Sequence, residues 1–69
     1  MSQEIRDILA KNIENLRNKK KLKREELSLL LGFDNSYISK LEKSRINITL
    51  DKLVKIAKFF DTDVYKLLK

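Results

Sequence analysis

The chain has 69 residues, with 16 lysines and arginines against 10 aspartates and glutamates, which gives a formal net charge of +6 at pH 7. This length allows one small domain, and the absence of cysteine and histidine excludes disulfide cross-links, the usual zinc ligands and histidine-dependent catalytic pairs. With no proline, a single glycine and no apolar run longer than three residues, we expect an all-helical, soluble, cytoplasmic domain without a cofactor, a metal or a membrane partner.

The first predicted helix covers residues 3–19. Its apolar residues recur at helical spacing and are expected to face the core: Ile5, Ile8, Leu9, Ile13 and Leu16. Leu22 follows this helix and is positioned to pack against the next one.

Positive charge is concentrated where the first helix ends. Between Arg17 and Arg24, six of the eight residues are cationic and none is anionic. Such a segment is typical of proteins that bind polyanions. A solvated helix end, whose lysines complement the helix dipole, would carry the same charge, so the charge alone leaves both interpretations open.

A second helix is predicted over residues 24–31, with Leu27, Leu30 and Leu31 facing inward. Gly32 is expected to end it, because glycine accepts the left-handed backbone that a sharp turn requires.

A third helix is predicted over residues 35–43. Asp34 is the expected N-cap, since its carboxylate could accept from the free amides that open the helix. Ile38 and Leu41 are the inward pair, and the remaining face is polar.

Two more helices complete the chain. Residues 50–60 form a helix capped by Thr49, and residues 64–68 form a short helix capped by Asp63.

The stretch 24–43 reads as helix, turn and helix. The crossing of two such helices needs a small side chain, which Ser28 supplies, and a glycine at the corner, which Gly32 supplies. These features specify a helix-turn-helix, whose second helix can enter the DNA major groove with its N-terminal residues foremost.

Three segments carry a resemblance to a known family: EELSLLLGFDNSYISKLEKS, INITLDKLVKIAKFF and DVYKLL. They are similar to the Cro/CI-type, or XRE-family, helix-turn-helix domain of phage repressors and bacterial regulators, and the similarity extends from Ile5 to Leu68. It implies a compact five-helix lambda-repressor-like domain over residues 1–69, in a bacterial or phage protein associated with the nucleoid. Within the family, YISKLEK followed by NITL is most similar to the controller proteins of restriction–modification systems.

Several positions depart from the family pattern. Lys23 replaces the usual hydroxyl cap of the second helix, and Arg24 replaces a common glutamine. Lys21 and Ser44 stand where glycines often end the first and third helices, and Ile48 stands where proline is frequent.

The resemblance implies a set of DNA-contacting residues. The base-reading positions are Asn35, Ser36 and Lys40, with Ser39 as a further candidate; asparagine can pair with adenine and lysine can donate to guanine. The alternative for Asn35 and Ser36 is ordinary polarity in a first helical turn. The positions implied to contact phosphates are Lys23, Arg24, Lys43, Arg45 and Asn47.

Two further groups of residues follow from the resemblance. Arg17 and Glu42 correspond to an internal salt bridge that ties the first helix to the end of the third. Phe59, Tyr65 and Leu68 mark a candidate dimer interface on the last two helices, although Phe59 and Tyr65 could instead belong to the rim of the core.

The sequence therefore predicts a homodimeric transcriptional regulator that binds a palindromic DNA operator. The alternative is a protein-interaction module on the same fold, such as an adaptor or antitoxin component. The polar, cationic face of residues 35–43 favours DNA, because a helix-docking surface would be apolar. We expect no enzymatic activity, since the acidic residues are scattered, and no small-molecule effector, since the chain has no room for a separate effector domain.

Overall fold

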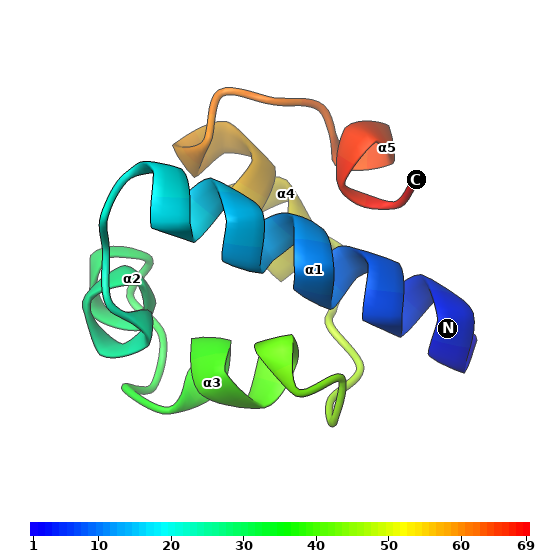
Figure 1. The fold of residues 1–69 in the computed structure, drawn as a ribbon, viewed down its shortest axis with the longest axis horizontal. Helices are drawn as coiled ribbons and strands as arrows, with labels where there is room; N and C mark the ends of the chain where they lie inside the picture. The colour runs from blue at the N-terminus through cyan, green and yellow to red at the C-terminus, as the bar shows by residue number, and fades with distance from the viewer.

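The computed structural model describes all 69 residues and is entirely helical apart from its loops (Figure 1). The five helices follow in the order α1 (Gln3–Lys19), α2 (Arg24–Leu30), α3 (Tyr37–Glu42), α4 (Leu50–Phe59) and α5 (Val64–Leu67). The longest helix, α1, crosses the molecule, with α3 on one side of it and α4 and α5 on the other (Figure 1). The all-α, five-helix class predicted from the sequence is confirmed.

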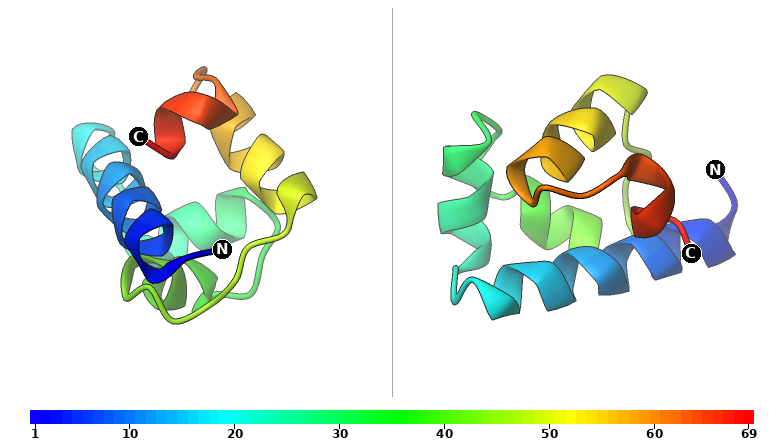
Figure 2. Two further views of the ribbon diagram at one scale, coloured as in Figure 1. Left: turned by 90° about the vertical axis from the view of Figure 1, so that its right-hand side faces the viewer. Right: turned by 90° about the horizontal axis from the view of Figure 1, so that it is seen from above.

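One apolar core holds the helices together. Its 11 buried residues come from all five helices and their ends: Leu9, Ile13, Leu27, Leu31, Ile38, Leu41, Leu53, Ile56, Ala57, Phe60 and Leu67. Viewed from the side in Figure 2, the helices surround this shared interior. Burying one large aliphatic side chain contributes about 1.5–3 kcal/mol, so the core is the main source of stability in a chain without cross-links.

Three apolar residues predicted to face inward lie at the surface instead. Leu30 is 61% exposed because the buried face of α2 is centred on Leu27 and Leu31, and at about 100° per residue Leu30 points well away from it. Ile5 and Ile8 are 38% and 37% exposed. They lie in the first turns of α1, which extend past α3 and α5 in Figure 1 and so have less protein to cover them.

The start of α3 also differs from the prediction. The helix begins at Tyr37 rather than at residue 35, and the Asp34 side chain does not cap it. Instead the backbone carbonyl of Asp34 accepts from the Tyr37 amide at 3.0 Å and closes a turn. The free amide of Ile38 finds its acceptor in another helix, where the buried Ser28 hydroxyl receives it at 3.0 Å. A side chain distant in sequence thus supplies the cap.

The other helix ends lie close to their predicted positions. α2, α3, α4 and α5 each end one residue earlier than the predicted ranges. Thr49 caps α4 by accepting from the Lys52 amide at 3.3 Å, whereas Asp63 occupies the N-cap position of α5 without a side-chain hydrogen bond.

The first four helices all end in the same way. After each one, a residue with positive φ lets two backbone amides bond back to carbonyls of the last turn, which is the Schellman arrangement. These left-handed residues are Lys21 (φ 57°), Gly32 (φ 76°), Ser44 (φ 58°) and Asp61 (φ 53°). Only Gly32 adopts this conformation without steric cost, so the other three positions hold backbone strain.

Exchanging glycine at two of these positions should shift stability in opposite directions. We expect Lys21→Gly to raise the free energy of unfolding by about 1 kcal/mol, because a side chain no longer opposes positive φ. Gly32→Ala should lower the free energy of unfolding by a similar amount, about 1 kcal/mol, because alanine is strained at this positive φ; the added Cβ would make only an ordinary contact, with Lys55 Nζ 3.4 Å away. Urea denaturation followed by circular dichroism measures both, and shifts of the same sign would contradict the strain argument.

Candidate nucleic-acid interface

The four predicted base-reading residues lie in and before the first turns of α3. Asn35 and Ser36 belong to the turn that precedes the helix, while Ser39 and Lys40 are in the helix itself. Asn35 and Lys40 are exposed, and the two serines are partly buried. Within α3, Ser39 and Lys40 lie on the face opposite Ile38 and Leu41, so these polar groups point away from the core.

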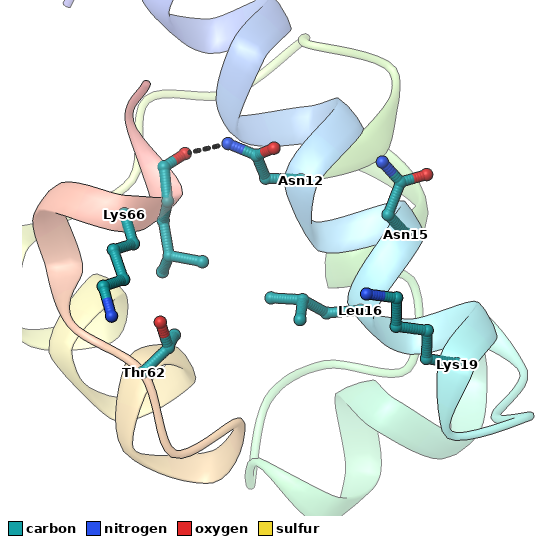
Figure 3. A pocket seen from close by; sticks show the side chains of 7 residues that line it. Asn12, Asn15, Leu16, Lys19, Thr62 and Lys66 are labelled. Atoms are coloured by element: carbon teal, nitrogen blue, oxygen red, sulfur yellow. Dashed lines mark hydrogen bonds between the residues drawn. The ribbon is translucent and has the colours of Figure 1, made fainter.

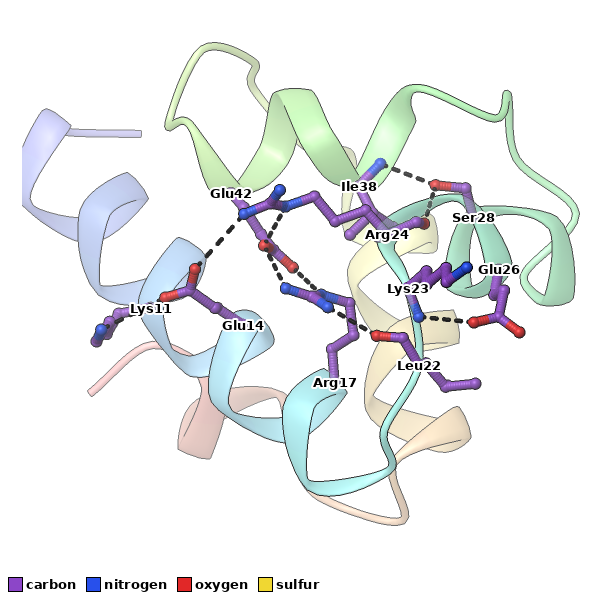
Figure 4. A network of polar contacts seen from close by, with 10 residues as sticks. All are labelled: Lys11, Glu14, Arg17, Leu22, Lys23, Arg24, Glu26, Ser28, Ile38 and Glu42. Carbon is purple, nitrogen blue, oxygen red and sulfur yellow. Dashed lines mark hydrogen bonds and ion pairs between the residues drawn. The ribbon is translucent and has the colours of Figure 1, made fainter.

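A buried ion pair holds α3 in this orientation (Figure 4). Arg17 is 8% exposed, and the side chain of Glu42 is only 3% exposed. The pair is bidentate, with Arg17 Nε and Nη2 lying 2.7 and 3.1 Å from the two carboxylate oxygens. The hydrogen bond from Arg17 to Glu42 raises the pKa of the guanidinium further above its usual value. The Nη1 group of Arg17 donates to the Leu22 carbonyl at 2.7 Å, which also fixes the loop between α1 and α2.

Arg24 completes this polar network from the start of α2. Its Nε donates to Glu42 at 2.8 Å, and its Nη2 lies 3.7 Å from a carboxylate oxygen of Glu14. The Arg24 side chain is 48% exposed, so its cation is held in place yet still reaches the surface beside α3. Lys23 precedes it and is exposed; its backbone amide donates to the Glu26 carboxylate at 2.8 Å, which supplies one half of a capping box.

The loop after α3 presents the other predicted phosphate contacts. Arg45 and Asn47 are exposed, whereas Ile46 and Ile48 between and after them are partly buried against the core. Exposed and partly buried side chains therefore alternate along this loop. Lys43, at the C-cap of α3, is exposed as well. Exposed cations therefore lie at the start of α2, and exposed cationic and amide donors lie at and after the end of α3.

Two contributors to this region were missed by the sequence analysis. Glu14 reaches Arg24, and Arg6 donates from its Nη1 to the Asn47 side-chain oxygen. The second contact joins residues 41 positions apart, so no local pattern indicates it.

The turn between α2 and α3 is fixed from behind by aromatic rings. Phe33 and Tyr37 pack with their centroids 4.8 Å apart, and Lys52 lies 4.6 Å from the centroid of the Tyr37 ring. Burial raises the pKa of the Tyr37 hydroxyl, which has no hydrogen-bond partner. Tyr37 therefore packs against its own fold, as a support for the turn.

A pocket of about 210 Å³ lies between α1 and the segment that carries α5 (Figure 3). It is lined by Asn12, Asn15, Leu16, Lys19, Thr62, Lys66 and Leu67. None of these is an acid, and no cluster of three or more potential metal ligands occurs anywhere in the chain.

The three predicted interface residues differ in exposure. Tyr65 is 59% exposed, with Lys69 Nζ 5.4 Å from its ring centroid. Phe59 and Leu68 are partly buried and pack against the core, and Phe59 makes an edge-to-face contact with Phe60 at 5.0 Å. Tyr65 is thus the most exposed of the three.

No helix has the combined length and apolarity needed to span a bilayer.

Taken together, an outward polar helix on a helix-turn-helix scaffold, with cations at both ends, defines a DNA-binding module. A family model described as helix-turn-helix matches residues 13–67, and the chain belongs to this family. Its relatives are transcription regulators rather than enzymes, so the chain is a DNA-binding transcriptional regulator.

Two bacterial relatives are similar to this chain over most of its length. The control protein C.SmaI of Serratia marcescens is 38% identical over 65 residues, which cover 94% of this chain and 77% of the relative. A hypothetical transcription factor of Neisseria meningitidis is 36% identical over 66 residues, which cover 96% of this chain and 62% of the relative.

Two solved structures with a similar fold are also a transcription factor and a controller protein. The crystal structure of the hypothetical transcription factor NHTF from Neisseria matches all of this chain and 80% of its own, with a TM-score of 0.89 and 33% identity. The restriction-modification controller protein C.AhdI of Aeromonas hydrophila matches 90% of this chain and 94% of its own, with a TM-score of 0.81 and 29% identity.

The free energy of unfolding should depend strongly on Arg17 and Glu42 being present together. Glu42→Ala leaves the Arg17 guanidinium buried without a counter-charge, so we expect it to lower the free energy of unfolding by about 3 kcal/mol. The double variant Arg17→Met with Glu42→Leu removes both charges at similar volume and should recover most of this loss. Thermal and urea unfolding measure the two variants, and a double variant no more stable than Glu42→Ala would contradict a coupled buried pair.

Proposed function

We propose that the protein acts as a homodimer on a palindromic operator, with the N-terminal end of α3 in the major groove. The observation that carries this proposal is the exposed polar group around Asn35 and Lys40, with cations before and after it. In this arrangement Asn35, Ser36, Ser39 and Lys40 face base edges. Lys23, Arg24, Lys43, Arg45 and Asn47 face phosphates.

The homodimer follows from the small size of the module. One short recognition helix offers few base contacts, and specific affinity usually needs two half-sites. Two copies related by a two-fold axis would place their recognition helices about 34 Å apart, on one face of the duplex. Tyr65, Leu68 and Phe59 lie toward the C-terminal end and form the proposed contact between copies.

We further propose that the regulated genes are those of a restriction–modification system. The support comes from two relatives, since C.SmaI is described as a control protein and C.AhdI as a restriction-modification controller protein. The protein would then act in the bacterial cytoplasm, and its own concentration would set the dimer population and hence operator occupancy.

A protein-interaction module on the same fold is less well supported. The exposed face of α3 carries Lys40 and partly buried serines rather than a row of apolar side chains. Gel-shift competition with random duplex DNA separates the two functions, because an interaction module would not shift any duplex.

Two substitutions should separate base reading from phosphate contact. Asn35→Ala should lose preference for the operator, obtained by selecting bound duplexes from a random pool, while keeping most non-specific affinity. Lys43→Ala should weaken binding to operator and random duplexes alike and reduce the slope of log K against log salt by about 0.9. Fluorescence anisotropy over a salt series measures both. Equal losses on both duplexes for both variants would contradict these roles.

A third substitution tests the proposed contact between copies. Tyr65→Glu should shift the dimer toward monomer and weaken operator binding, because it places a charge in an apolar contact. Leu50→Glu is the matched control, since Leu50 is 70% exposed on another part of the surface. Analytical ultracentrifugation measures the association, and an unchanged dimer in Tyr65→Glu would place the interface elsewhere.

A further inference from the structure

Arg6 lies in the first turn of α1, and its side chain reaches the loop that follows α3. Its Nη1 donates to the side-chain oxygen of Asn47, and its Nη2 donates to the Gln3 side-chain oxygen at 3.1 Å. Arg6 takes part in no ion pair, and its Nε is buried without an acceptor. The guanidinium of Arg6 therefore donates to amide oxygens, whereas those of Arg17 and Arg24 pair with carboxylates.

This contact determines how the Asn47 side chain is oriented. A guanidinium has only donors, so the atom of Asn47 that faces it must be the amide oxygen. The NH2 group then lies on the opposite branch of the amide. Asn47 is exposed while Ile46 and Ile48 pack against the core, and its NH2 group makes no hydrogen bond within the chain, so that group is free to donate to a bound ligand.

The same end of α1 also approaches the beginning of the loop. The nearby Ser44 hydroxyl, and secondarily the Gln3 amide that donates to Asp7 at 2.8 Å, lower the pKa of the Asp7 carboxyl. Ser44 is the left-handed residue that follows α3, so α1 lies close to this loop near both of its ends, at Ser44 and at Asn47.

We infer that Arg6 is a positioning residue for the DNA backbone: it holds the Asn47 oxygen so that the Asn47 NH2 group donates to a phosphate. The inference rests on the proposed phosphate contact of Asn47. An amide fixed in advance loses less conformational entropy when it binds, and a donor at a set position fixes the register of the protein on the duplex. Arg6 thus extends the binding machinery to a helix outside the helix-turn-helix.

A double-mutant cycle between Arg6 and Asn47 tests this inference. Arg6→Met, Asn47→Ala and the double variant are titrated into operator and random duplexes over a salt series. Arg6→Lys, which keeps a donor for Asn47, is the conservative variant. Lys11→Met is the matched control, because it removes one exposed cation from the same helix. Circular dichroism and thermal unfolding verify that each variant is folded.

We expect Asn47→Ala to raise Kd about tenfold and Arg6→Met about fivefold, on both duplexes. In the Asn47→Ala background, Arg6→Met should change Kd by less than about twofold, since its partner is already gone. Arg6→Lys should keep most of the affinity, and the salt slope of Arg6→Met should match that of Lys11→Met.

Three results would overturn the inference. Equal effects of Arg6→Met in both backgrounds, with a salt slope reduced by about 0.9, would mean that Arg6 itself contacts a phosphate. An Asn47→Ala variant that binds like wild type would remove the contact that Arg6 is said to position, while DNA binding itself stands. Failure of the wild-type protein to bind any duplex would instead refute the proposed function.

Discussion

The ion pair between Arg17 and Glu42 is the constraint on which the rest of the interface depends. It joins the last turns of α1 and α3 across the interior, and Arg17 continues the connection to the Leu22 carbonyl in the next loop. Because an isolated buried charge is costly, any movement of α1 relative to α3 that separated the two side chains would be strongly disfavoured. Glu42 also accepts a hydrogen bond from Arg24 Nε, so the same carboxylate sets the position of the cation at the start of α2. One buried acid thereby fixes where α1, α2 and α3 meet.

α1 acts as the frame for DNA recognition. Toward its C-terminal end it holds α3 through Arg17, and toward its N-terminal end it holds the following loop through Arg6. Between these two points, α3 packs Ile38 and Leu41 inward and leaves its polar face free. Rigid support of this kind matters for sequence reading, because a base contact requires a hydrogen-bonding group to arrive within a few tenths of an ångström of its partner.

The sequence predicted the fold well because its signals are local and repeated. Apolar spacing identified five helices, Gly32 marked the turn, and Ser28 was expected at the helix crossing, where it is indeed buried. Errors arose where distant residues decide the outcome. Asp34 has the chemistry of an N-cap, yet Ser28 on another helix takes that role toward Ile38. Leu30 fits an apolar pattern, but it points away from the buried face of α2. The contact between Arg6 and Asn47 joins residues 41 positions apart, so no pattern in the sequence indicates it.

Selection of bound duplexes from a random pool tests the central claim most directly, which is that two copies of an outward-facing α3 read DNA symmetrically. The account predicts enrichment of an inverted repeat whose half-sites are centred about 10 base pairs apart, corresponding to one helical turn. A pool that shows no enriched sequence, or one enriched for a single unrepeated site, would contradict it.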